Sequence, residues 1–161
     1  MPATLPTEDA LDEFLGKCEA ALLGIDVRHD PRTRCIGWNL ETSTAICDYV
    51  VAGDKTGTFS LPWLHDSLPE TKPGIGQFVV LSNFDGVPRA LLQTIALTLV
   101  TFGEIDETHT ALDGPSVRGL AVWRGIHTKY WNGLLEPLGK EITDDMPVIV
   151  ERFACVYPAR A

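Results

Sequence analysis

The chain has 161 residues, of which 45% are hydrophobic, and a formal net charge of −9; this size and composition predict one compact domain with a sizeable core. The negative charge argues against strong nonspecific binding to nucleic acid, because phosphate contacts need a stripe of basic residues. No apolar run approaches the roughly 18 residues of a membrane span, and the acidic N-terminus does not resemble a secretory signal. We therefore expect a cytoplasmic protein that does not bind membranes.

The four cysteines, Cys18, Cys35, Cys47 and Cys155, show neither the paired spacing of a zinc site nor the density of a disulfide scaffold. They fall mostly within helix and strand patterns, where a free cysteine packs as a small hydrophobe. We expect reduced structural thiols. No cluster of His, Cys and Asp stands at ligand spacing, so the sequence predicts no metal and no other cofactor.

The first segment is predicted to be an amphipathic helix from Thr7 to Leu23, because apolar residues recur at helical spacing: Leu11, Phe14, Leu15, Cys18 and Leu22. The polar stretch from Asp26 to Cys35, with one proline and three arginines, is predicted to be a connecting loop. We expect residues 1–35 to precede a main domain that comprises residues 36–161. The apolar stripe of the helix packs across that domain or, as the alternative, forms a dimer interface, so the oligomeric state stays open.

A second helix is predicted over residues 44–52, where apolar residues fall mostly on one face. Gly53 stands at the position where a left-handed C-terminal cap is expected, and the β-branched, alternating residues beyond it predict a strand. Lys55 and Thr58 therefore lie where a helix leads into a strand, a position from which side chains can face a cleft. In a regular strand Thr58 and Ser60 share one face, and their hydroxyls bond to a ligand, to water or to neighbouring strands.

The remaining elements are predicted as a long loop, two strands, a helix and a final strand, over residues 61–74, 77–82, 89–101, 116–134 and 146–157 respectively. The two middle strands are joined by a hairpin turn that contains Asp85-Gly86. In the final strand Glu151 and Arg152 point to opposite faces among apolar residues, so each must reach the end of the sheet or a polar partner.

Three segments, at residues 51–61, 123–127 and 145–158, together resemble the ASCH family, in the order and at the separations of its longer bacterial branch. The signature is the Gly-x-Lys-x-x-Thr turn, and the strand Met-Pro-Val-x-x-Glu-Arg-Phe supports it. The resemblance covers roughly residues 36 to 158. It implies an α+β fold with a small PUA-like β-barrel of about five to seven strands, flanking helices and a polar cleft beside the signature turn.

This resemblance also implies a function. Family members are discussed as RNA-binding modules, and some are amidohydrolases that remove the acyl group from N4-acylated cytidine with a Lys, Thr and Glu constellation. The first two of these residues correspond to Lys55 and Thr58, whereas Pro115 falls where the Glu would stand. Nearby acidic residues are the candidates for the missing carboxylate: Asp113 first, then Glu107 and Glu104.

Five further residues are candidates for substrate binding. Trp38 and Trp63 would stack on a base, the alternative being core packing. His127 matches a histidine of the bacterial branch, and it either acts at the site or is a hydrogen-bonded core residue. Ser60 would bond to a base, and Arg152 belongs to a set of basic residues in the segments that flank the presumed cleft.

These residues support a hypothesis of amide hydrolysis in which Thr58 is the nucleophile and Lys55 activates it. Asp113 orients the lysine or carries the proton to the departing amine, and backbone amides around Gly57 hold the oxyanion. The expected partner is a small nucleoside or nucleotide, with RNA bound weakly. The alternatives are a binding module for RNA or nucleotides without catalysis, or a ribonuclease that uses Lys55 and His127.

Overall fold

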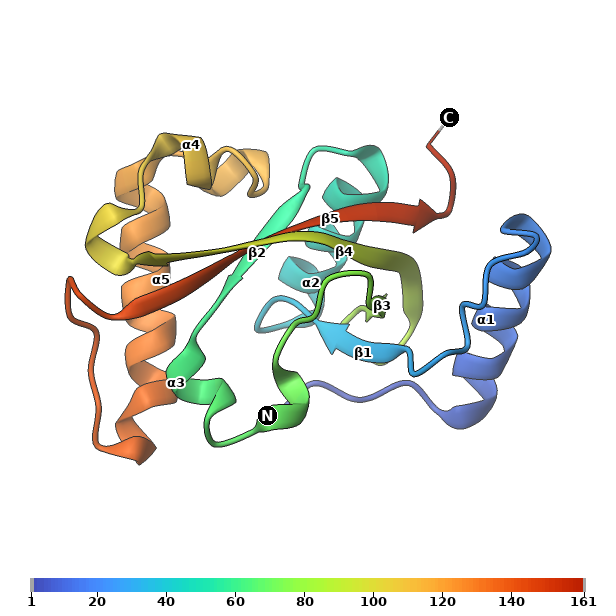
Figure 1. Ribbon diagram of the computed structural model, residues 1–161, viewed down its shortest axis with the longest axis horizontal. Helices are drawn as coiled ribbons and strands as arrows, with labels where there is room; N and C mark the ends of the chain where they lie inside the picture. Colours follow the sequence, from blue (N-terminus) through green and yellow to red (C-terminus); the bar gives the residue numbers. More distant parts are fainter. Residues whose placement is uncertain (1, 161) are drawn as a thin grey trace.

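The computed structural model describes residues 2–160 and shows an α+β fold in which one curled sheet is flanked by helices (Figure 1). Within these residues the sheet has five strands: β1 Arg32–Cys35, β2 Gly57–Ser60, β3 Phe78–Ser82, β4 Pro88–Thr101 and β5 Pro147–Tyr157. The long helices of the same region are α1 Glu8–Ala21, α2 Leu40–Ala52 and α5 Leu120–Leu135. Short helices complete the connections: α3 Pro62–His65, η1 Pro69–Thr71, η2 Phe102–Glu104, α4 Glu107–Thr110, η3 Pro115–Val117 and η4 Glu136–Leu138.

The strand order across the sheet is β1-β3-β4-β5-β2, with β1 parallel to β3 and the other neighbouring pairs antiparallel. The long strands β4 and β5 cross the middle of the fold, and a register shift between Thr94 and Ala96 bends their pairing (Figure 1). One ion pair shows that the sheet curls: the Arg34 guanidinium of β1 lies 3.4 Å from the Glu151 carboxylate of β5. In a flat sheet these strands would stand about 14 Å apart, so the contact requires the sheet to bend toward itself.

Three clusters of buried side chains hold the long helices on the sheet. One packs α5 against β2 and β5 around Trp123 and Trp131. A second packs α2 against β3, β4 and β5, and includes Cys47 and Phe153. The third packs α1 on β3 and β4 around Phe14. The N-terminal helix thus buries its apolar stripe on the same sheet as the other two.

Local sequence signals explain how α2 begins and ends. Its first residue is Leu40, not residue 44 as predicted, because the Asn39 side chain caps the helix by accepting from the Thr42 amide at 2.8 Å. The helix ends as predicted: Gly53 adopts a φ of 81°, and its amide bonds to carbonyls of the last helical turn. This cap reverses the chain direction at the start of the signature turn.

Two predicted loops contain regular structure. Residues 32–35 form β1, so the loop prediction for them is wrong. The segment is polar and lacks apolar alternation, and it is a strand only because it pairs with β3, which is distant in the sequence. Residues 61–74 contain α3 and η1, since Pro62 and Pro69 stand at the start of short helical turns. The hairpin turn between β3 and β4 is confirmed, with the Asn83 side chain accepting from two amides of the turn.

The cysteines are unpaired thiols, and Cys18 and Cys47 are buried in the cores. Burial raises the pKa of both thiols to about 11. They are therefore protonated at neutral pH and pack as apolar residues. Across residues 2–160, no group of three or more His, Cys, Asp or Glu residues is placed to hold a metal ion, and no helix is long and apolar enough to span a membrane.

Candidate active site

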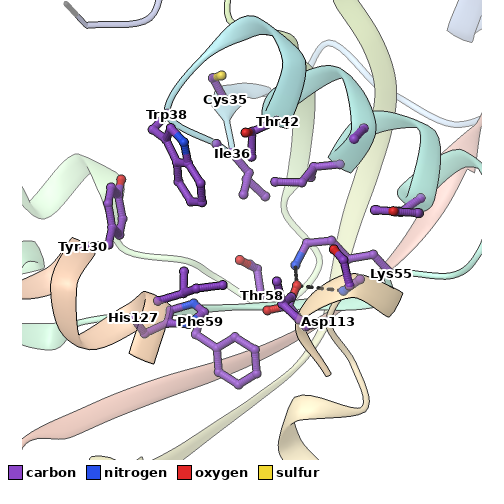
Figure 2. Close-up of a pocket in the computed structure, with 18 of the residues that line it drawn as sticks. Cys35, Ile36, Trp38, Thr42, Lys55, Thr58, Phe59, Asp113, His127 and Tyr130 are labelled. Atoms are coloured by element: carbon purple, nitrogen blue, oxygen red, sulfur yellow. Dashed lines mark hydrogen bonds and ion pairs between the residues drawn. The ribbon is translucent and has the colours of Figure 1, made fainter. Parts of the chain in front are cut away.

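A cavity of about 560 Å³ opens between α2, α5 and β2, and residues of the signature turn lie in its wall (Figure 2). This volume falls within the range of small-molecule sites, about 300–1,000 Å³. Polar and aromatic side chains both line it, among them Arg34, Lys55, Thr58, Asp113, Trp38, His127 and Tyr130. The mixture suits a small ligand that has both a polar group and a flat ring.

The chain enters the cavity through the turn between α2 and β2. The Lys55 amide donates to a carbonyl of the last turn of α2 at 3.1 Å, which keeps the turn against the helix end. Thr56 and Gly57 then donate their amides to the carbonyl of Leu112, at 2.9 and 3.1 Å. That carbonyl comes directly before Asp113, so the same bonds hold the lysine turn and the aspartate loop together.

Gly57 is required where β2 approaches its neighbours. A Cβ at this position would stand 2.5 Å from the carbonyl oxygen of Glu151 and 3.0 Å from the side chain of Leu112. A backbone oxygen in a strand ladder cannot swing aside as a flexible side chain can, so the contact demands a residue without a Cβ. The glycine therefore lets β2 lie close to both β5 and the aspartate loop.

Lys55 and Asp113 form a buried ion pair. The Lys55 ammonium donates to Asp113 Oδ1 over 2.6 Å, and the two residues are only 3% and 7% exposed. The same oxygen accepts from the Gly114 amide at 2.8 Å, and the Arg118 guanidinium holds the loop by donating to the Asp113 carbonyl at 2.8 Å. Burial lowers the pKa of Lys55, whereas the Asp113 carboxylate acts in the opposite direction. A proton held between two such influences is suited to transfer.

Thr58 is buried on β2 and lines the cavity with this pair (Figure 2). Its partner across the antiparallel ladder is Glu151 on β5, so the two side chains share one face of the sheet. The polar neighbours bond elsewhere, Lys55 to Asp113 and Glu151 to Thr94. Within residues 2–160 no hydrogen bond engages the Thr58 hydroxyl, which leaves it free for a ligand.

Glu151 and Arg34 also belong to this region, although neither was predicted as a site residue. Glu151 is 3% exposed, and its two carboxylate oxygens accept from Thr94 Oγ1 at 2.9 Å and from the Arg34 guanidinium at 3.4 Å. Arg34 in turn lines the cavity. A signal for Glu151 was present in the sequence, an acid among apolar strand residues, whereas Arg34 stood in a segment predicted to be a loop.

His127 lines the cavity from α5 and also packs in the fold. Its Nδ1 donates to the Trp123 carbonyl at 2.9 Å, and its ring stacks on the Trp123 indole with centroids 4.0 Å apart. Burial lowers the pKa of His127 from its ordinary value, so the ring is neutral at neutral pH. Because Nδ1 carries the proton, Nε2 is a hydrogen-bond acceptor.

Trp38 and Tyr130 supply exposed aromatic surface to the cavity. Trp38 comes from the segment between β1 and α2 and Tyr130 from α5, and they are 55% and 46% exposed. In Figure 2 both lie on the side of the cavity away from Lys55. An exposed indole or phenol face can stack on a flat ring, so this side is suited to hold a base.

Three residues predicted to bind substrate do not line the cavity. Ser60, farther along β2, bonds to Nε2 of His65 at 3.0 Å. Trp63 packs against the core under α5, and the Lys140 ammonium stands 5.0 Å from its ring centroid. Arg152 is exposed, because the alternation of β5 turns it to the face opposite its buried neighbour.

The other predicted carboxylates lie outside the cavity wall, and two of the predicted oxyanion donors bond elsewhere. Glu104 accepts from a backbone amide at the end of β4 at 2.8 Å, and Glu107 is exposed in the first turn of α4. The prediction of oxyanion donors around Gly57 is wrong for its own amide and the one before it, since both are bonded to Leu112. An oxyanion in this cavity needs another donor.

Comparisons with known proteins agree with this fold. The family model of the ASCH domain matches residues 35–157. The structure of an ASCH domain from Lactobacillus crispatus JV V101 superposes with a TM-score of 0.83 at 20% identity, covering 94% of this chain and 96% of that one. Protein EF3133 from Enterococcus faecalis V583 superposes with a TM-score of 0.75 at 22% identity, over 92% of this chain and 86% of that one. Among curated proteins, none matches the sequence.

At such low identity the two structural likenesses show the fold alone. The family model, in contrast, matches sequence over most of the chain, including the signature turn and the final strand. The chain therefore belongs to the ASCH domain family, whose PUA-like fold is often proposed to bind RNA.

Proposed function

We propose that the protein is an amidohydrolase that removes the acyl group from a small N-acylated nucleoside of the N4-acylcytidine type. The observation that carries this proposal is the buried Lys55–Asp113 pair in one cavity with the unbonded hydroxyl of Thr58. Amide hydrolysis needs a nucleophile, a proton carrier and a donor for the oxyanion. These three side chains supply the first two, with Asp113 as the carboxylate in place of the Glu that Pro115 replaces.

In the proposed reaction the Thr58 oxygen attacks the acyl carbon, and the neutral amine of Lys55 accepts the hydroxyl proton. A C–O bond forms while the carbonyl electron pair moves onto the oxygen, which gives a tetrahedral oxyanion. On collapse the C–N bond breaks, and Lys55 and Asp113 pass the proton to the departing amine. Water then attacks the acyl ester of Thr58, one water proton returns to the threonine through Lys55, and the carboxylic acid leaves.

The charges of the cavity support a neutral ligand over a polyanion. Its two cations, Lys55 and Arg34, are each paired with a buried carboxylate, Asp113 and Glu151 respectively. Glu41 also lines the wall, and the whole chain has a net charge of −9. Among the described lining residues no cation is left unpaired, whereas phosphate binding depends on available Lys and Arg. The same balance disfavours the ribonuclease alternative.

A binding module without catalysis is the second candidate, and one observation favours it. At 2.6 Å the Asp113 carboxylate stabilises the ammonium form of Lys55, and an ammonium cannot accept the proton of Thr58. Catalysis therefore requires that burial prevails and Lys55 is neutral, whereas a binding module is expected if the carboxylate prevails and Lys55 is charged. A cytidine-type ring would bind in the same cavity in both cases, with Trp38 beside it.

Incubation with N4-acetylcytidine, with chromatographic detection of cytidine, tests the proposal. We expect Lys55→Met and Thr58→Val each to abolish turnover, since residues that act as one unit lose activity together. Thr98→Val, an isosteric change at an exposed position of β4, is the control and leaves turnover unchanged. Turnover that survives in either site variant contradicts the mechanism. Binding of cytidine without turnover in the wild-type protein supports the binding module instead.

A further inference from the structure

A tetrahedral oxyanion at this site needs a hydrogen-bond donor, and nearby donors are already engaged. The amides of Thr56 and Gly57 both donate to the carbonyl of Leu112. The Lys55 ammonium donates to Asp113. Loss of one oxyanion donor typically slows acyl transfer by about 10²–10³-fold, so a working site of this kind contains such a donor.

Arg34 is the cavity residue with donors to spare. A guanidinium carries five N–H donors in a rigid fork and stays charged at any working pH. Within residues 2–160 the Arg34 guanidinium makes one polar interaction, with Glu151 Oε1 at 3.4 Å, and the Arg34 side chain is 33% exposed. Because it also lines the cavity with Lys55 and Thr58, its remaining N–H groups are available to a ligand there.

Glu151 holds this guanidinium in place. Its Oε2 accepts from Thr94 Oγ1 at 2.9 Å while its Oε1 accepts from Arg34, so the carboxylate is fixed from two sides. Glu151 also lies directly opposite Thr58 in the β2–β5 ladder, where facing Cβ atoms stand about 4.5–5.5 Å apart. The carboxylate that binds Arg34 is therefore the cross-strand neighbour of the nucleophile.

We propose that Arg34 binds the acyl carbonyl oxygen and stabilises the oxyanion formed when Thr58 attacks, and that Glu151 positions the guanidinium. This inference rests on the amidohydrolase function proposed above. In the step, a C–O bond forms between Thr58 and the acyl carbon, the carbonyl electron pair moves to the oxygen, and the hydroxyl proton moves to Lys55. Arg34 stays protonated throughout and contributes hydrogen bonds alone.

The charge of Arg34 has a second effect on the same site. Burial is the main cause of the lowered pKa of Lys55, and the positive charge of Arg34 adds to it, since a nearby cation disfavours the ammonium form. Loss of the guanidinium charge therefore raises the pKa of Lys55. This change is measurable without any turnover.

The first test compares Arg34→Gln with Arg32→Gln, a control two residues earlier on β1. Arg32 bonds to the carbonyl of Lys72 and is not part of the cavity wall. We expect Arg34→Gln to lower kcat for N4-acetylcytidine by about 10²–10³-fold with little change in KM, and Arg32→Gln to alter neither. Wild-type kcat in Arg34→Gln overturns the inference while leaving the amidohydrolase function standing. A wild-type protein without turnover overturns that function, and the oxyanion role with it.

The second test follows Lys55 itself, by a ¹³C-NMR titration of its Cε resonance. We expect its pKa to rise in Arg34→Gln and to keep the wild-type value in Arg32→Gln. Arg34→Lys keeps the positive charge and loses the planar set of guanidinium donors. We expect it to leave the Lys55 pKa near the wild-type value and still to lower kcat. It replaces Arg34→Gln if that variant does not fold. If the pKa of Lys55 in Arg34→Gln equals the wild-type value, the guanidinium lies outside the site and the inference is overturned.

The positioning role of Glu151 is tested by Glu151→Gln and by the double variant with Arg34→Gln. We expect Glu151→Gln to lower kcat less than Arg34→Gln does, with KM unchanged. The double variant has the kcat of Arg34→Gln, because both substitutions act through one group. Losses that add in the double variant overturn the positioning role, as they would show that Glu151 acts independently of Arg34.

Discussion

Replacing Asp113 by Asn separates the two influences on Lys55, because it keeps the shape of the side chain and removes its charge. In the wild-type protein the carboxylate stands 2.6 Å from the Lys55 ammonium, and the lysine is 3% exposed. The asparagine oxygen can still accept from the Gly114 amide. What disappears is the anion that favours the charged lysine, so burial drives Lys55 to its neutral form.

The size of the effect follows from the proton that Lys55 must release. The ordinary pKa of this amine is 10.5, so folding with a neutral lysine at about pH 7.5 costs up to about 4 kcal/mol, at about 1.36 kcal/mol per pH unit. Between the lowered folded pKa and 10.5 the unfolded chain binds the extra proton, and stability therefore rises with pH. At about pH 9.5 the same cost is about 1.4 kcal/mol.

Urea unfolding followed by tryptophan fluorescence measures this difference. We expect Asp113→Asn to lose up to about 4 kcal/mol of unfolding free energy relative to wild type at about pH 7.5, and much less at about pH 9.5. The double variant Lys55→Met/Asp113→Asn lacks the titrating amine, so it is the control without this pH dependence. An equal loss at both pH values, or a loss below about 0.5 kcal/mol at both, would refute the reasoning.

The same variant tests the proposed proton transfer. If Asp113 carries the proton to the departing amine, Asp113→Asn lowers the rate with N4-acetylcytidine by a factor of about 10² or more. The rate is best compared at a pH where the variant remains folded, about pH 9 from the argument above. An unchanged rate there removes Asp113 from the mechanism.

Three further substitutions test other parts of the cavity. His127→Phe keeps the stacking on Trp123 and removes a group whose pKa is lowered by burial. Below about pH 6.5 the wild-type protein loses stability, because the histidine of the unfolded chain takes up a proton. Urea midpoints at about pH 7.5 and 5.5 should therefore show a smaller loss of stability at the lower pH in the variant than in the wild-type protein. Gly57→Ala places a Cβ 2.5 Å from the Glu151 carbonyl, so we expect about 1–3 kcal/mol lower unfolding free energy, and a wild-type midpoint would mean that β2 has room to shift. Trp38→Ala should weaken cytidine binding by about 1–3 kcal/mol in a calorimetric titration, whereas unchanged affinity removes this indole from the binding surface.

The lysine and threonine of the site could be predicted from sequence because their geometry is local. Gly53 ends the helix in a left-handed conformation, and the strand begins at Gly57, within a few residues. Lys55 and Thr58 are thereby brought to one turn without any long-range pairing. The strands β3, β4 and β5 followed from alternation and turn signals of the same local kind, whereas the α+β class was implied by the family resemblance.

The rest of the site depends on contacts that cross the chain. Asp113 bonds to Lys55 over 58 positions of sequence, and its candidacy came from the family resemblance and not from periodicity. Arg34 was missed because β1 is polar and is a strand only through its pairing with β3. Ser60 shows the converse error: it shares strand β2 with Thr58, yet lies beyond the cavity on a partner of its own, His65. Local periodicity orients a side chain, but it does not locate the end of a cavity.

The two ion pairs of the cavity differ in ways that match their proposed roles. Lys55–Asp113 is short at 2.6 Å, with side chains 2% and 11% exposed, whereas Arg34–Glu151 is longer at 3.4 Å, with the arginine 33% exposed. In the short, buried pair two opposing influences act on the pKa of Lys55, burial and the Asp113 carboxylate, which suits this group to proton transfer. In the longer pair the guanidinium keeps its charge and has N–H groups left for a ligand. Only the curl of the sheet brings β1 to the β2–β5 ladder, so the proposed chemistry depends on that closure as much as on the reactive side chains.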